Sequence, residues 1–264
     1  MRFALPGFGN KTVQEQEDIF AYLYANWRDL QLNSAAVNTL METNFVTNAN
    51  EFCTELFKPK ELFDPSDALL ASVFSGERNK FPGERFMSDG WLAILRKAGL
   101  RTSTEADMII QCATKIESMG NDVMSAIENH DDFDADLSDR KNEIPFELWS
   151  LAESVVNVIL ANFATLYNSD FCQKIGKIVF VPAEKGFPSI GGKTGGKRVL
   201  ASYSEAILSK DWPLAWSSAP ILAKQAIIPP DYSWGAFRLR SPPAFSTVLK
   251  HLQVNVVKYL HVNI

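Results

Sequence analysis

Apolar residues recur at three- and four-residue spacing along most of this chain, and this spacing predicts a mainly helical protein. The clearest case is residues 62–117, where we expect a short helix, a turn, a second helix and a long third helix. Asp64-Pro65-Ser66 predicts the start of the first, because aspartate bonds its own backbone and proline fixes φ for a first turn. The expected core positions are Leu69, Leu70, Val73 and Phe74, then Trp91, Leu92, Leu95 and Leu100, then Ile109, Cys112, Ile116, Met119, Val123 and Ile127.

Capping signals mark several helix ends. Ser88 is expected to cap the second helix, and Gly99 stands where a helix C-terminus favours a residue that tolerates positive φ. Thr102 and Glu105 have the spacing of a capping box before the third helix. The same spacing in Thr12 and Glu15 predicts that a helix begins near the N-terminus.

Two more helices are expected in the second half of the chain. One runs from Pro145 to Tyr167, with Leu148, Ala152, Val155, Ile159, Phe163 and Leu166 at core spacing. The other follows Ser241-Pro242-Pro243 and carries Phe245, Val248, Leu249, Leu252, Val256 and Leu260. Because no polar run closes this last apolar face, we expect a segment of a longer polypeptide that self-associates when isolated, with relief by Val256→Glu and Leu260→Glu.

Four short segments have strand character. Residues 44–46 and 52–57 flank a polar turn, and Ile178–Val181 and Arg198–Ser202 flank a glycine-rich loop. The predicted fold class is therefore α+β, predominantly helical, with two short antiparallel β-hairpins near residues 44–62 and 177–202. The similar order of elements around the two hairpins suggests an internal half-repeat.

Length and composition predict the domain organisation and the cellular compartment. With 264 residues, 46% apolar and 22% charged, the chain can bury a core, and we expect one segment, 1–264, with a possible internal division near 130–142. Cys53, Cys112 and Cys172 lie far apart and are odd in number, which favours a reducing compartment over a disulfide framework. No stretch reaches the roughly 18 apolar residues of a membrane span, so we expect a cytoplasmic protein that makes no membrane contact.

Charge is unevenly distributed. Residues 1–172 hold 14 basic and 27 acidic residues, a net charge of about −13, whereas residues 173–264 hold 12 and 4, about +8. The basic residues are scattered among turns and are not striped along a helix with aromatic partners, so nucleic acid is an unlikely partner. We expect the two oppositely charged parts to attract each other.

Two motifs come close to ligand sites, and each fails at a required position. Residues 187–194 resemble a phosphate-binding loop, but Phe187 stands where the first glycine is needed and no helix is predicted after Thr194. Residues 132–143 have EF-hand spacing, but Leu137 stands where the loop needs glycine and Asp139 where an apolar residue packs. The alternatives are a flexible hairpin loop and a solvated acidic linker.

Other residue types offer little chemistry. His130, His251 and His261 are too widely spaced for a local metal motif, and no serine, cysteine or carboxylate pairing supports catalysis. Most aromatic residues occupy helix-core positions, but Trp212, Trp216 and Trp234 lie in a proline-punctuated stretch and could line a groove. We predict no catalytic, cofactor-binding or metal-binding residues.

The order of motifs nevertheless resembles one known family. LFDPS, a short apolar helix, FP, W-L-x-x-L-x-x-x-G-L-R-T-S and a long helix are similar to the repeated segments of sacsin and plant sacsin-like proteins, as is LRSPPAFSTVLKHL at Leu239–Leu252. The resemblance implies a noncatalytic scaffold or client-contact segment of a large cytoplasmic chaperone or co-chaperone. Its partners would be other repeats of the parent protein, the seventy-kilodalton chaperone system and clients, and any ATPase activity would belong to another region. The alternative is a small calcium- or nucleotide-binding protein that uses Asp132–Glu143 or Gly186–Thr194.

Overall fold

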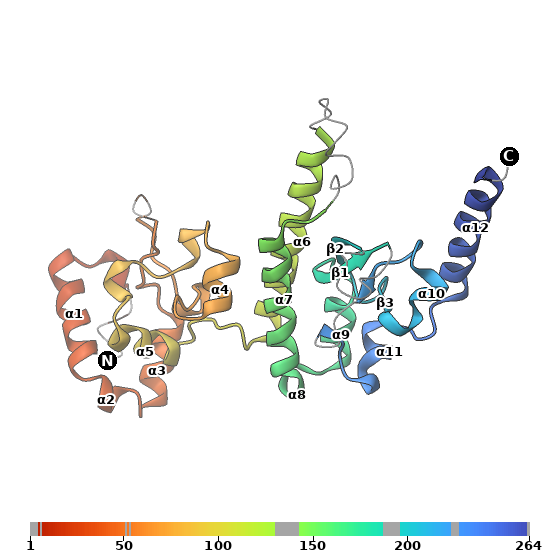
Figure 1. The fold of residues 1–264 in the computed structure, drawn as a ribbon. Helices are drawn as coiled ribbons and strands as arrows, with labels where there is room; N and C mark the ends of the chain where they lie inside the picture. Colours follow the sequence, from red (N-terminus) through yellow and green to blue (C-terminus); the bar gives the residue numbers. More distant parts are fainter. Residues whose placement is uncertain are drawn as a thin grey trace. The chain divides into compact units, whose positions relative to one another are not determined.

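A computed structural model describes residues 5, 7–50, 52, 54–129, 143–186, 196–222 and 227–262. The chain forms two compact units, residues 1–108 and 109–264 (Figure 1). The fold is α+β and predominantly helical, as the apolar spacing predicts. The boundary at residue 108 lies on the N-terminal side of the division expected near 130–142, a stretch that falls outside the described residues.

The first unit consists of helices joined by closely packed irregular chain. Its helices are α1 (Val13–Ala25), α2 (Trp27–Leu30), α3 (Ser34–Glu42), α4 (Ala68–Val73) and α5 (Asp89–Lys97), with short 3-10 helices at Phe8–Asn10, Pro59–Glu61, Arg78–Lys80 and Glu84–Phe86. The predicted capping box of α1 is present, since Thr12 and Glu15 bond each other's backbone amides. Ser88 caps α5, and Gly99 has a φ of +94° after it.

A cluster of aromatic rings forms the core of the first unit. Phe20, Phe86 and Trp91 lie 5.2 to 5.6 Å apart between ring centroids, nearly edge to face, and Phe45 joins them. Edge-to-face contact is a preferred arrangement because each ring has a negative face and a positive edge. The four core positions predicted for the α5 segment, Trp91, Leu92, Leu95 and Leu100, are all buried.

The Asp64-Pro65-Ser66 motif has a different role from the one predicted. The Asp64 carboxylate accepts the Ser66 amide at 2.9 Å, as an aspartate turn does, but α4 begins only at Ala68 with Asp67 as its cap. Asp67 also accepts the amide of Ser103 at 2.7 Å, and Asp64 binds the guanidinium of Arg96. The two aspartates therefore tie α4 to α5 and to the segment that leads into α6.

The first predicted hairpin is reduced to single bridges. Val46 pairs with Phe57, while Asn48 pairs with Pro82 of a distant segment. The bridge to Pro82 is completed by bonds from Ala49 N to Phe81 O (2.9 Å) and from Gly83 N to Thr47 O (2.7 Å). The chain near residue 48 therefore pairs with residues from two parts of the sequence.

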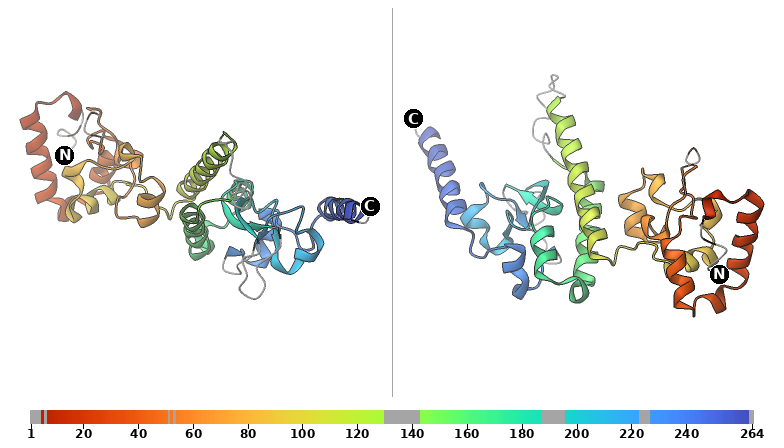
Figure 2. Two further views of the ribbon diagram at one scale, coloured as in Figure 1. Left: turned by 45° about the horizontal axis from the view of Figure 1, so that its top comes forward. Right: turned by 180° about the vertical axis from the view of Figure 1, so that it is seen from behind.

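The second unit packs helices against a small mixed sheet. Its elements are α7 (Phe146–Ala161), α8 (Phe163–Leu166), α9 (Ser169–Ile175), β1 (Val181–Lys185), β2 (Lys197–Ala201), β3 (Ile207–Leu208), α10 (Trp212–Ala215), β4 (Ile221–Leu222), α11 (Trp234–Phe237) and α12 (Phe245–Val262), with 3-10 helices at Ser209–Asp211 and Asp231–Ser233. Helix α6 (Ala106–Asn129) begins three residues before the boundary of the units. Figure 2 shows α6 and α7 side by side, and α7 contacts both β1 and β2.

The sheet has the strand order β2-β1-β4-β3. The predicted hairpin is confirmed, because Val181 pairs with Ala201 and the antiparallel register continues to Lys185 and Lys197. Its first strand begins at Val181 and not at Ile178. The parallel pairing of β3 with β4 was not predicted, because each strand has only two residues.

The long helices are close to the prediction. Helix 145–167 is broken into α7 and α8 at Asn162, and its six predicted core residues are all buried. In α6, Ile109, Cys112 and Ile116 are buried, whereas Met119, Val123 and Ile127 are only half-buried. Only half of the predicted capping box precedes α6, where Glu105 accepts the amide of Thr102 at 3.0 Å.

Helix α12 packs through its more polar side. His251 is buried against Trp216, with ring centroids 5.7 Å apart, and its Nδ1 lies 2.6 Å from the hydroxyl of Ser217. The predicted core positions Phe245, Leu249 and Leu252 are instead 80%, 42% and 53% exposed. The side chains of Val256 and Leu260 lie outside the described part of the chain.

Candidate functional site

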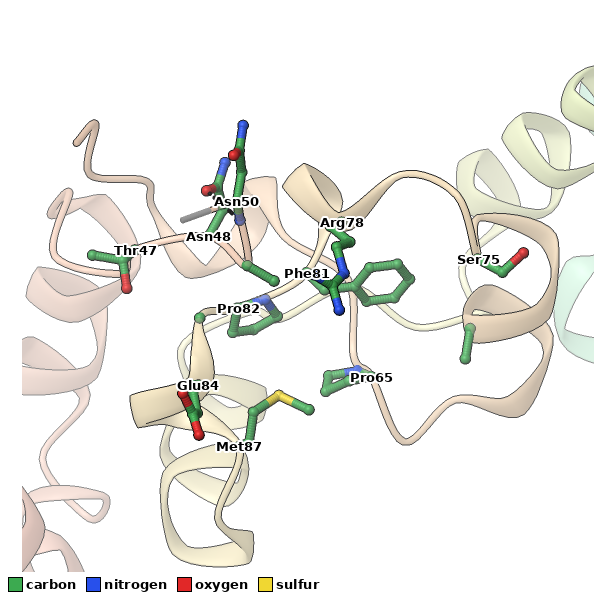
Figure 3. A pocket seen from close by; sticks show the side chains of 13 residues that line it. Thr47, Asn48, Asn50, Pro65, Ser75, Arg78, Phe81, Pro82, Glu84 and Met87 are labelled. Carbon is green, nitrogen blue, oxygen red and sulfur yellow. Dashed lines mark hydrogen bonds between the residues drawn. The ribbon is translucent and has the colours of Figure 1, made fainter. Parts of the chain in front are cut away.

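A groove in the first unit is the strongest candidate for a functional site. Its volume is about 720 Å³, and its walls come from the segments around residues 47–50, 65–78 and 81–87. This volume lies within the range of about 300 to 1,000 Å³ that ligand pockets occupy. Figure 3 shows Glu84 and Met87 on one side of the groove, with Asn48 and Asn50 on the opposite side.

Close approach of two backbones shapes one wall of the groove. A Cβ on Gly83 would lie 2.6 Å from the Thr47 hydroxyl and 3.0 Å from the Asn48 carbonyl oxygen. Only glycine avoids these overlaps, so the bridge between Asn48 and Pro82 depends on it. Phe81 is extended, as expected before a proline, and its ring packs edge to face on Phe63 at 6.0 Å.

The groove combines exposed apolar surface with hydrogen-bond donors. Met87 is 46% exposed, and Pro65 and Phe81 are partly exposed. The Oδ1 atoms of Asn48 and Asn50 accept backbone amides at 3.1 and 3.2 Å, whereas their Nδ2 groups have no partner within the described chain. These amide groups can donate to carbonyl oxygens of a bound molecule.

One cation lies in the groove wall. Arg78 is exposed, and no carboxylate of the described residues pairs with it. A second hollow of about 370 Å³ shares Ala49, Asn50 and Arg78 with the groove and continues to Phe52, which is 94% exposed. Arg78 thus lines both hollows, the one that includes Met87 and the one that includes Phe52.

The sequence motifs include Pro65 and Phe81-Pro82 of the groove, in LFDPS and FP, but none of its polar residues. Arg78, Asn48 and Met87 lie in turns that carry no known motif, and they come together only through the pairing of residues 47–49 with 81–83.

The candidate motifs from the sequence lie elsewhere. Residues 187–194 and 132–142 fall outside the described residues. Glu143, the last residue of the EF-hand spacing, is described, and its Oε1 lies 3.1 Å from the guanidinium of Arg198 and 3.3 Å from the Arg198 amide. In the structure this carboxylate thus interacts with β2.

The remaining candidate residues that the structure describes are buried or have structural contacts. Cys112 and Cys172 are buried, Cys53 and His130 are outside the described residues, and the side chain of His261 is undescribed. Trp212 and Trp216 pack against a small core cluster, and Trp234 donates to the Pro229 carbonyl at 2.8 Å. Across the described ranges, no group of three or more metal-ligating side chains comes together.

Comparison of the chain with known protein families, with curated proteins and with solved structures finds no match. Within the described residues, every helix is too short or too polar to cross a membrane.

Proposed function

We propose that this chain is a noncatalytic scaffold or client-contact segment of a cytoplasmic, sacsin-like chaperone or co-chaperone, and that the groove of the first unit binds an extended polypeptide. The observation that carries the proposal is the combination of the unpaired donors of Asn48, Asn50 and Arg78 with exposed Met87. An extended chain offers carbonyl oxygens to the amides, an acidic side chain to Arg78 and an apolar side chain to Met87.

The resemblance of the LFDPS and LRSPPAF segments to sacsin repeats supports the chaperone context. Under this proposal the partners are other repeats of the parent protein, the seventy-kilodalton chaperone system and client chains. The surrounding reading frame tests it, because a coding region for an ATPase domain of the ninety-kilodalton heat-shock type upstream would support it. A short isolated gene would contradict it.

Peptide binding tests the groove directly. The probes are fluorescent ten-residue peptides in a glycine-serine background that carry one leucine and one aspartate, with versions in which leucine becomes serine or aspartate becomes lysine. We expect the parent peptide to bind best in anisotropy titrations. Met87→Glu should weaken binding at least fivefold, and Arg78→Glu should abolish the preference for aspartate over lysine.

Matched controls separate the groove from general surface effects. Lys97→Glu reverses an exposed charge outside the groove, and Leu32→Glu replaces an apolar side chain that is also outside it and more exposed than Met87. Both should leave peptide affinity within twofold of the original chain. Equal affinity for all peptides, or equal losses in the groove and control variants, would refute peptide binding at this groove.

A further inference from the structure

A second polar cavity lies in the other unit and is unrelated to the groove. Its volume is about 350 Å³, and three segments line it: the turn before β3, the chain between α11 and α12, and the first turn of α12. Its polar lining residues include Ser204, Glu205, Arg238, Arg240, Ser246 and Thr247.

Two arginines line this cavity. Arg238 and Arg240 are exposed and flank Leu239, which is buried and donates its amide to the Trp234 carbonyl at 3.0 Å. Both side chains line the same cavity, so both guanidinium groups are available to one ligand there. Neither has a carboxylate partner among the described residues, although exposed Glu205 lines the same cavity.

Packing of the preceding residue, Phe237, fixes the backbone that carries the two arginines. Buried Phe237 contacts Tyr203 and Phe163, with ring centroids 5.0 and 6.1 Å away. Gly176 approaches so closely that a Cβ there would lie 2.7 Å from the Phe237 carbonyl oxygen. The two arginines therefore extend from a fixed support, which is what recognition of a small anion requires.

Arg238 occupies a conformation that arginine seldom adopts. Its φ is +62°, in the left-handed region, immediately after α11, where glycine or asparagine is usual. A glycine would adopt this backbone conformation without strain. The backbone therefore does not explain the arginine here, and its guanidinium group does.

The remaining lining groups complete a set of donors. The hydroxyls of Ser246 and Thr247 have no partner within the described chain, and the Ser204 hydroxyl lies 3.0 Å from that of Ser202. Two guanidinium groups and nearby hydroxyls match the oxygens of a tetrahedral oxyanion. The net charge of about +8 on residues 173–264 favours an anion as well.

We propose that the cavity between Arg238, Arg240 and the first turn of α12 binds a phosphate monoester, with both arginines as its principal ligands. A single Glu205 leaves the charged side chains of the cavity net positive, so a dianion is favoured over a neutral or cationic ligand. The cavity lies near the lower end of the usual volumes, which suits a phosphate group and its immediate carrier.

Calorimetric titration of the full chain tests this site. The probes are O-phospho-L-serine and inorganic phosphate, with L-serine and L-glutamate for comparison. We expect phosphoserine to bind more tightly than glutamate, and serine not to bind. The double variant Arg238→Gln/Arg240→Gln should lose at least tenfold in affinity, whereas Lys174→Gln/Lys185→Gln, which removes two exposed charges elsewhere in the unit, should stay within twofold.

The two phosphate probes identify the source of the ligand. Tighter binding of phosphoserine than of inorganic phosphate would support an ester carried by a partner chain, and equal binding would support a site for the free ion. Absence of binding by both probes, or equal losses in the two double variants, would overturn the proposal.

Arg238→Gly separates binding from folding. Because glycine favours the left-handed backbone, we expect this variant to melt at the same temperature as the original chain or higher, while phosphoserine affinity falls. Two results together would show that the arginines are structural and that the proposed site is wrong. These are a lower melting temperature for Arg238→Gly and an unchanged phosphoserine affinity for Arg240→Gln.

Discussion

Single residues show where the stability of the first unit resides. Trp91 is only 8% exposed, and its ring contacts those of Phe20 and Phe86. Removing such a ring loses both the transfer free energy and the packing contacts around it. The residue matters because of this enclosure.

Trp91→Ala should therefore lower the free energy of unfolding by about 3 to 5 kcal/mol. Urea denaturation followed by circular dichroism measures the change. Leu32→Ala is the control, because Leu32 is largely exposed and the cost should stay within about 0.5 kcal/mol. A loss below about 1 kcal/mol for Trp91→Ala would mean that the core repacks around the missing ring.

Asp64 is the most informative charged residue of the same unit. Burial raises the pKa of its carboxyl, but hydrogen bonds from Arg96 and Ser66 outweigh burial and hold the pKa below its ordinary value. A lowered folded-state pKa means that the stabilisation is present above the ordinary value of 3.8 and is lost as the pH falls through the folded-state value.

Asp64→Asn should lower the free energy of unfolding at pH 7 by about 1 to 3 kcal/mol, because charge-assisted hydrogen bonds to Arg96 are lost. Urea melts at pH 7 and pH 3 should show that the difference between variant and original chain shrinks in acid. The exposed Asp29→Asn change is the control. A difference that does not depend on pH would contradict the role assigned to the carboxylate.

At the scale of elements, the second unit depends on close approach between α9 and α11. Gly176 ends α9, and a Cβ there would lie 2.7 Å from the Phe237 carbonyl oxygen and 2.8 Å from that of Cys172. Both atoms belong to the backbone, so neither can move as a flexible side chain could. This contact holds the chain that leads into the arginine segment.

Gly176→Ala should cost about 1 to 3 kcal/mol of unfolding free energy, because the extra methyl group forces α9 and α11 apart. Gly235→Ala in α11 is a matched control, since nothing lies within 4 Å of its would-be Cβ and alanine is the better helix former. Thermal melts should show a lower transition for the first variant and an unchanged or higher one for the second. Equal transitions would mean that the backbones separate at little cost.

For the whole molecule, the exposed side of α12 bears on assembly. Phe245, Leu249 and Leu252 are separated by four and three residues and are all exposed in the monomer, whereas His251 is buried. Contiguous apolar surface of this kind drives association when a second copy covers it. The self-association expected from the sequence stays a prediction.

Sedimentation velocity at several concentrations tests this expectation. The 264-residue chain should form dimers or larger soluble species as its concentration rises, and Leu249→Glu/Leu252→Glu should restore the monomer. The control Val13→Glu/Leu32→Glu changes two exposed apolar residues of the first unit and should have no effect on association. A monomer at every concentration would refute the prediction.

Local signals were sufficient for the helices and for the larger hairpin. The helix caps Thr12 and Ser88 and the buried faces of α5 and α7 follow from residues within one or two turns, so periodicity and capping predicted them. The hairpin of β1 and β2 was predicted for a similar reason, because its two strands are close in sequence and flank a glycine-rich loop. The sacsin resemblance entered through these same local motifs.

The tertiary structure alone decided which distant residues meet. Asp64 reaches Arg96, Asn48 pairs with Pro82, and β3 pairs in parallel with β4, and none of these contacts has a local signature. Likewise, α12 buries His251 against Ser217 and Trp216 and leaves its apolar residues exposed. The apolar spacing of the helix predicted the reverse, because it carries no information about these tertiary contacts. Both candidate sites lie between segments far apart in sequence, so they exist only once the chain has folded.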